Sequence, residues 1–235
     1  MSVSISANSP ASVVGNASTG LTTASFNTPT ASYLVAMVSC DNTGGAATGS
    51  VTDSKGNSWT LLKRSNVNSS PAEVWGLFVQ QPQTGMTVSC TFTNGANMST
   101  DSMLNVQVLA GASASQPGTT NSASGTVDTI AIVPKGIGSM IFGMLGKGTG
   151  NISYAANAQS TTLALNADAA SGSTQWAFRS KVVTSSLASV TYGSSTAAAV
   201  TVDIVAVEIL ASNGLSNNYQ FGQVGDGMSV SEKIR

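Results

Sequence analysis

The sequence predicts an all-β protein, a jelly-roll-like antiparallel β-sandwich. Short segments rich in β-branched and aromatic residues recur along the chain, and clusters of Gly, Asn, Pro or Ser separate them. No long segment places apolar residues at the 3.6-residue spacing of an amphipathic helix. A weak repetition between the two halves further favours a sandwich built from a duplicated half.

The expected strands occupy most of both halves of the chain. Each is bounded by residues that favour turns. They are residues 33–39, 58–64, 72–80, 86–93, 103–111, 129–134, 139–145, 160–167, 174–183, 188–193 and 200–210.

The order of these strands is similar in the two halves. "YLVAMVS", "EVWGLFVQ", "MTVSCTF" and "LNVQVLAGAS" are followed later by "SMIFGML", "TQWAFRSKVV", "ASVTYGS" and "VDIVAVEILAS". Trp75 and Trp176 stand at matching points, about 100 residues apart, a period well above that of solenoid repeats. We expect one sandwich domain over residues 1–211. The alternative is two sandwiches, 1–113 and 127–211, with the Gly- and Ser-rich segment 111–126 as a linker.

The composition limits the partners that this chain can bind. Charged residues make up 8% of the sequence, and the formal net charge is −1. Ordinary soluble proteins carry about 25% charged residues, so the surface is expected to be neutral and polar. Without a basic stripe to neutralise phosphates, nucleic acid is not an expected partner.

The chain shows no segment typical of secretion or membrane insertion. No Lys or Arg precedes Lys55, although a secretory leader needs a basic start. The densest apolar segment, 197–211, is interrupted by Asp203 and Glu208 and is too short to span a bilayer. We therefore expect synthesis in the cytoplasm without a signal peptide.

The segment "VTDSKGNSWTLL", residues 51–62, contains several residues that calcium loops use. An EF-hand loop needs oxygen ligands at alternate positions, but Lys55 takes the third place and Gly56 the fourth. The segment instead matches a hairpin turn in which the Asp53 side chain bonds nearby backbone and Gly56 has a positive φ. Asn57 then leads into the returning strand. We expect a structural turn here, and neither a metal site nor a cofactor.

This turn and the strands after it resemble a known group of domains. The pattern V-x-D-x-x-G-N-x-W, followed by a V-W strand and a G-x-T-V-x-x-x-F strand, resembles β-sandwich domains of bacteriophage virion proteins and of some bacterial surface proteins. The resemblance covers residues 31–112 and, more faintly, 129–211. It implies a virion structural protein, such as a capsid decoration or a tail fibre, whose partners are other virion proteins and copies of itself. An exterior position on the virion also suits a Ser-, Thr- and Gly-rich chain with few charges.

Catalytic chemistry has little support in the sequence. The chain has no His, so catalysis by a Ser-His-Asp or Cys-His arrangement is excluded. Asp203 and Glu208, five residues apart in an expected strand, point to opposite faces and are interpreted as providing solubility and edge protection. We expect no enzyme. A polysaccharide-cleaving enzyme is the third hypothesis, after a glycan-binding receptor or adhesin module.

The three Trp residues are interpreted in two ways, as core anchors of a structural protein and as a contact for a glycan. Trp75 and Trp176 lie among aliphatic residues at strand spacing and are expected as core anchors. Trp59 flanks the turn and is the candidate for stacking on a host surface glycan. Cys40 and Cys90 are expected as two buried thiols, with a disulfide as the alternative.

The C-terminal tail, residues 212–235, combines several Gly residues with isolated apolar ones. It is expected to be a docking segment that adds to the sheet edge of a neighbouring subunit, with Tyr219 and Phe221 as assembly contacts. The N-terminal arm, residues 1–24, is the alternative docking segment. Homo-oligomers are expected, because particles are built from repeated parts.

Overall fold

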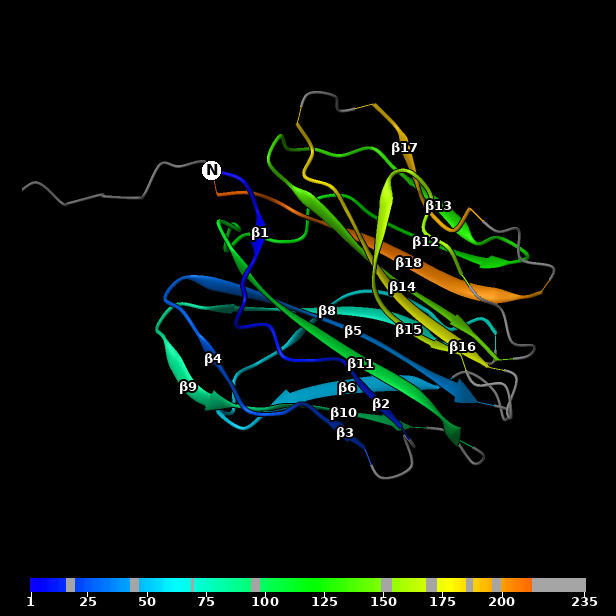
Figure 1. Cartoon of the computed structure of the whole chain (residues 1–235), viewed down its shortest axis with the longest axis horizontal. Coiled ribbons are helices and arrows are strands. Elements are labelled where there is room, and N and C mark those ends of the chain that lie inside the picture. The colour runs from blue at the N-terminus through cyan, green and yellow to red at the C-terminus, as the bar shows by residue number, and fades with distance from the viewer. Residues whose placement is uncertain are drawn as a thin grey trace, which may run out of the picture.

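The computed structural model describes residues 1–15, 20–42, 47–68, 70–93, 98–148, 154–167, 173–184, 188–195 and 200–212. Within these residues every regular element is a β-strand, and every strand pairing is antiparallel (Figure 1). The prediction of an all-β sandwich fold is therefore confirmed. In the described part of the chain no helix is long and apolar enough to cross a membrane.

The first half of the chain forms one large sheet and two small ones. The large N-terminal sheet has the order β1-β11-β5-β8-β7, and β2 also pairs with β11. Its strands are β1 (Ser4–Ile5), β2 (Val13–Gly15), β5 (Ser32–Asn42), β7 (Thr60–Ser65), β8 (Ala72–Val79) and β11 (Met98–Ala110). The small sheets comprise β3 (Leu21–Thr22), β10 (Val88–Thr93) and β6 (Thr48–Asp53) in one, and β4 (Phe26–Thr28) and β9 (Gln83–Met86) in the other.

The second half forms one large sheet and one ribbon. The large C-terminal sheet has the order β12-β18-β14-β16-β15. Its strands are β12 (Thr120–Gly125), β14 (Met140–Lys147), β15 (Ser160–Ala167), β16 (Thr174–Ser180) and β18 (Val202–Ile209). The ribbon consists of β13 (Thr129–Ile132) and β17 (Val190–Gly193).

The two large sheets have the same strand order. From one edge to the other, β11, β5, β8 and β7 correspond to β18, β14, β16 and β15, and β12 takes the place of β1 and β2. Trp75 on β8 and Trp176 on β16 fall on corresponding strands. The topology thus repeats between the halves, as the order of the expected strands indicated.

Three hydrophobic cores separate four layers of sheet (Figure 1). The first core lies between the large N-terminal sheet and the small sheets, and includes Leu34, Val88 and Phe92. The second lies between the two large sheets, which pack face to face. The third lies between the large C-terminal sheet and the ribbon, around Trp176.

The central strands are apolar on both faces because they belong to two cores at once. On β5, Leu34 and Ala36 contact the first core, whereas Val35 and Met37 contact the second. Side chains of a strand alternate between the two faces of its sheet, so a strand covered on both sides has a continuous apolar sequence. This explains "YLVAMVS" and the similar runs of β14 and β18.

The facing large sheets are related by an approximate two-fold arrangement. Strand β14 packs on β5 at the centre, β18 packs on β7 and β8, and β11 packs on the corresponding β15 and β16. Gly146 lies in this interface, where a methyl group would overlap the Ser39 hydroxyl and the Ser70 carbonyl. The absence of a side chain at Gly146 therefore lets the two halves approach closely.

Two segments differ from the expectations for them. In the connector 111–126, residues Thr120–Gly125 form β12 and pair with β18, so the second part of the connector belongs to the sheet. In the N-terminal arm, β1 and β2 pair with β11, β3 pairs with β10, and Val3 is fully buried. The arm therefore covers an edge of its own sheet, and its docking on a neighbour stays a prediction.

Each half thus contributes one sandwich, and the second core joins them. Whether residues 1–211 unfold as one domain, or residues 1–113 and 127–211 as two, stays a prediction, as does the finer assignment to a jelly roll.

Candidate functional site

The turn predicted from residues 51–62 is organised by the carboxylate of Asp53. Its Oδ1 accepts hydrogen bonds from the backbone N–H of Lys55 at 2.7 Å and of Asn57 at 3.3 Å. Gly56 has a φ of +72°, in the left-handed region that favours glycine. The Gly56 N–H donates to the Asp53 carbonyl at 3.3 Å. The side chain of Asp53 therefore bonds its own backbone, as the sequence indicated.

The turn does not close a hairpin, and that part of the prediction is wrong. Strand β6, before the turn, pairs with β10 in a small sheet, whereas β7, after it, pairs with β8 in the large N-terminal sheet. The turn therefore carries the chain from one layer of the sandwich to the other. A sequence pattern specifies the local turn but not which strands pair on either side of it.

The Asp53 carboxylate is also bonded to side chains. Its Oδ2 accepts from the indole Nε1 of Trp59 at 2.8 Å, and both oxygens accept from the Asn57 amide at 3.1 and 3.2 Å. The Asn57 amide also bonds that of Gln83 from β9. Both carboxylate oxygens are thus engaged by protein donors. No group of three Cys, Asp or Glu residues that could hold a metal ion occurs in the described ranges.

Trp59 is half-buried beside this polar cluster. It packs against the first core while its indole N–H is held by Asp53, so the orientation of the ring is fixed. A fixed, partly exposed indole next to two carboxamides, Asn57 and Gln83, is a surface on which a sugar ring can stack and form hydrogen bonds. The glycan hypothesis therefore has a defined location.

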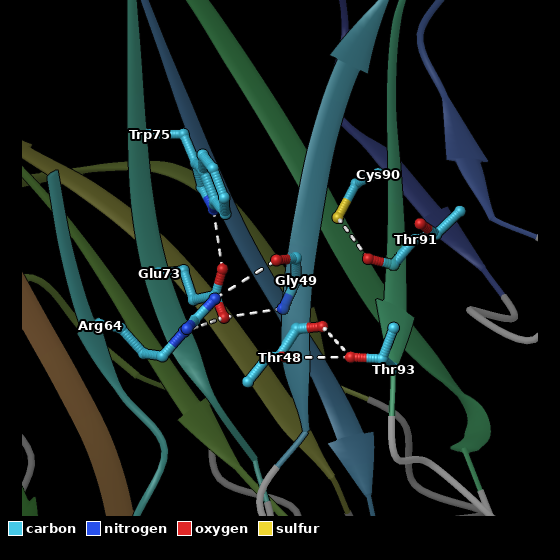
Figure 2. A network of polar contacts seen from close by, with 8 residues as sticks. All are labelled: Thr48, Gly49, Arg64, Glu73, Trp75, Cys90, Thr91 and Thr93. Carbon is cyan, nitrogen blue, oxygen red and sulfur yellow. Dashed lines mark hydrogen bonds and ion pairs between the residues drawn. The ribbon is translucent and has the colours of Figure 1, made fainter. Parts of the chain in front are cut away.

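A second polar network, around Glu73, lies inside the first sandwich (Figure 2). The Glu73 side chain is fully buried, and its Oε1 accepts from Arg64 Nε at 2.6 Å and from the backbone N–H of Gly49 at 2.8 Å. Its Oε2 accepts from Trp75 Nε1 at 2.7 Å. Arg64 also donates to the Gly49 carbonyl at 3.3 Å.

This network joins the two layers of the first sandwich at one end. Glu73 and Trp75 belong to β8 and Arg64 to β7, whereas Gly49 belongs to β6 of the opposite layer (Figure 2). A side chain at Gly49 would collide with the Glu73 carboxylate, because an added Cβ would lie 2.7 Å from Glu73 Oε2. Sequence reasoning missed this network. The available signal was a lone acid in an apolar strand, one strand away from an Arg.

The two expected core anchors differ in burial. Trp176 is fully buried, with 0% of its surface accessible to solvent. It stacks on Tyr154 at a ring-centroid distance of 5.6 Å. Phe178 lies 4.8 Å from it on the same strand. Trp75 is only partly buried at the rim of the first core, where its indole N–H bonds Glu73.

Asp203 and Glu208 are fully buried, so their interpretation as exposed residues that protect a sheet edge is wrong. Both lie on β18, which is an interior strand between β12 and β14. Asp203 faces the first half of the chain. It accepts from Ser65 Oγ at 2.6 Å and from the backbone N–H groups of Val67 at 3.2 Å and Asn68 at 2.8 Å.

Glu208 holds two connections within the second half. Its carboxylate accepts from the backbone N–H groups of Thr119, Lys135 and Gly136 at 2.9 to 3.0 Å, and from Ser139 Oγ at 2.7 Å. Buried charges of this kind persist only when fixed donors surround them. Like Glu73 and Asp203, Glu208 therefore serves as an acceptor that ties separate segments together.

The buried nucleophiles are poorly suited to reaction. Cys40 and Cys90 are free and buried, and burial together with the nearby Glu73 carboxylate raises the pKa of each thiol well above its usual value. A thiol with a raised pKa is largely protonated and therefore inert. Lys147 is fully buried on β14, and burial lowers the pKa of its amine.

One small open hollow, of about 160 Å³, lies at the side of the second sandwich. Its lining includes Pro134, Ser180, Lys181, Val183 and Tyr192. Glu73, Asp203, Glu208 and Lys147 are not among its lining residues. This hollow is smaller than the 300–1,000 Å³ typical of small-molecule sites.

The tail residues Tyr219 and Phe221 lie outside the described part of the chain. No family model, curated protein or solved structure matches this chain.

Proposed function

We propose that this protein is a non-enzymatic structural component of a bacteriophage virion, a capsid decoration or a tail-fibre-like part of the exterior that acts through subunit assembly. The observation that carries this proposal is the use of the buried carboxylates. Glu73, Asp203 and Glu208 each accept several hydrogen bonds from fixed donors and join segments that are distant in the sequence. Carboxylates that are bonded in this way make the fold rigid, and none of these three acids is free to act in catalysis.

The outer surface also suits a part of an assembly. The chain carries 8% charged residues and a formal net charge of −1, so copies of it repel one another weakly. Its partners in this proposal are copies of itself and other virion proteins.

The proposal is tested by locating the chain in particles. Mass spectrometry of purified virions should find it at a fixed copy number, and electron cryo-microscopy should place a four-layered β body on the exterior. A chain that is absent from purified particles would contradict the proposal.

The second candidate function is a glycan-binding receptor or adhesin module, which the fixed and partly exposed indole of Trp59 favours. A glycan array probed with the full chain and with Trp59→Ala separates the two functions. Binding that disappears in a folded Trp59→Ala variant favours the receptor module. An array without binding leaves assembly as the function.

A further inference from the structure

Strand β15 forms an open edge of the large C-terminal sheet. It pairs with β16 on one side, and apart from the turn bond of the Ser160 N–H to the Asn157 carbonyl at 3.0 Å, no backbone hydrogen bond from the described residues reaches its other side. The strand spans eight residues, Ser160–Ala167, and its sequence "STTLALNA" has neither charge nor proline. Leu165 on this strand is 38% exposed. Natural sheets usually protect such edges with charges, proline, bulges or a covering segment. β15 has one break in register, between Thr162 and Ala164, and its second half, Ala164–Ala167, pairs with β16 in regular register.

Three other edges of the described sheets are protected. β7 corresponds to β15 in the first half and carries Lys63 and Arg64. Beside β12 lies the ribbon, because Asn121 Nδ2 donates to the Ala131 carbonyl at 2.8 Å and Thr119 Oγ1 donates to the Val133 carbonyl at 2.7 Å. The N–H and C=O of Gly49 on β6 bond Glu73 and Arg64. Compared with these three edges, β15 is uncharged and no described segment covers it.

The chain also has a segment that suits this edge. The described residues end at Ser212, and residues 213–235 span roughly 75 Å when extended. Residues 228–235, "MSVSEKIR", alternate apolar Met228 and Val230 with polar residues, which is the period of a strand with one apolar face. This stretch equals β15 in length.

We propose that residues 228–235 of one copy add as an antiparallel strand to the open edge of β15 in a second copy. This inference rests on the proposed assembly function and names the contact that it uses. Main-chain hydrogen bonds supply the affinity. Met228 or Val230 then pack beside Leu165, which is 38% exposed and whose partner across the strands is Trp176.

The direction of the strands favours a second copy over the same chain. β18 ends at Ile209, at the same end of the sheet where β15 begins with Ser160. A tail that takes the shortest path, about 14 Å from β18 to the β15 edge, meets β15 at its start and runs parallel to it. An antiparallel strand from the same chain would need residues 213–227 to run along the full length of β15 first. Every pairing in the described chain is antiparallel, and a tail from another copy can enter from the Ala167 end.

Cross-linking of two full-length variants tests the contact. Protein with Leu165→Cys is mixed with protein carrying Val230→Cys and treated with a short bis-maleimide. The native thiols of Cys40 and Cys90 are buried and do not compete. The expected product is a mixed dimer, whose yield rises with concentration and exceeds several-fold the yield of a control pair in which Lys63→Cys on β7 replaces Leu165→Cys.

The alternatives give different products. Equal yields with Leu165→Cys and Lys63→Cys would overturn the choice of edge, and dominant Leu165→Cys homodimers would show edge-to-edge pairing instead. Only intrachain cross-links in the double variant would show that the tail folds back on its own chain.

Light scattering supplies a second readout. Leu165→Lys should lower the oligomeric mass of the full chain, whereas Leu165→Thr should leave it unchanged. Oligomers and virion incorporation that persist without the β15 cross-link would refute this inference alone. Absence of the chain from particles would refute the proposed function.

Discussion

The indole N–H of Trp75 donates a 2.7 Å hydrogen bond to the carboxylate of Glu73, two residues earlier on the same strand. Residues two apart on a strand share a face, so the ring covers the buried acid. The same carboxylate binds Arg64 beside it and Gly49 in the opposite layer. One acid thus connects three strands.

Replacing Glu73 with Gln should destabilise the protein strongly. The amide puts a donor among three existing donors and leaves Arg64 without its partner, a change that typically costs about 3–5 kcal/mol. Urea unfolding measures the loss. Lys63→Gln on the neighbouring strand is the control and should change the free energy of unfolding by less than about 0.5 kcal/mol. Equal effects of the two changes would show that the network is dispensable.

Asp203→Asn tests the contact between the halves. The new amide can satisfy only part of the set formed by Ser65 and the N–H groups of Val67 and Asn68, so a cost of about 1–3 kcal/mol is expected. Hydrogen exchange should speed up in the connection after β7. The matched control is Ser124→Asn, because Ser124 is the exposed residue of β12 that pairs with Asp203. Unchanged exchange at Val67 and Asn68 would argue against this role.

Gly56→Val should destabilise the Asp53 turn through backbone conformation alone. No atom lies within 4 Å of the position that an added Cβ would take, but the φ of +72° costs a β-branched residue about 1–3 kcal/mol. Asn tolerates this region better, so Gly56→Asn should cost clearly less. Thermal melts of both variants decide, and equal losses would mean that the φ is not the cause.

The loss of stability on replacing a Trp with Ala should increase with the burial of the ring. Trp176→Ala removes a fully buried ring from between Tyr154 and Phe178 and should cost about 3–5 kcal/mol. Trp59→Ala should cost less, since that ring is half-buried. Chemical denaturation measures both, and a milder effect at Trp176 would contradict its role as a core anchor.

Stability should fall in alkaline solution because of the two thiols. Burial raises the pKa of Cys40 and Cys90 above the ordinary 9.0. Above that value the unfolded chain loses protons that the folded chain retains, so unfolding becomes easier by about 1.4 kcal/mol per pH unit for each thiol. Below pH 9 this contribution to stability is fully present. The Cys40→Ala, Cys90→Ala double variant should show a flatter decline between pH 9 and 11, and an identical slope would rule the thiols out.

The sequence was a good guide to strands and a poor guide to their partners. The alternation and β-branched content of 160–167 predicted β15 with its exact bounds, and 33–39 fell within β5. Short strands such as β1 and β3 escaped, because two residues carry no period and form only against an existing edge. The turn at Gly56 was predictable from local chemistry, whereas the layers that it connects depend on contacts distant in the sequence.

Burial of the acids was the largest miss. Asp203 and Glu208 look like surface residues in a sequence, because the donors that satisfy them come from residues 65–68 and 119–139. The sequence of β18 around them gives no indication of those donors. Only the packing of β18 between two cores shows that they must be buried.

The repeated halves give the molecule a direction. Two identical halves related by a two-fold axis would offer the same edge twice, and contacts between such units would close on themselves. Here the corresponding edges have diverged, since β7 carries Lys63 and Arg64 whereas β15 has no charge. A subunit whose two edges differ contacts its neighbours through two different surfaces. This is the heterologous geometry from which rings and helical arrays are built.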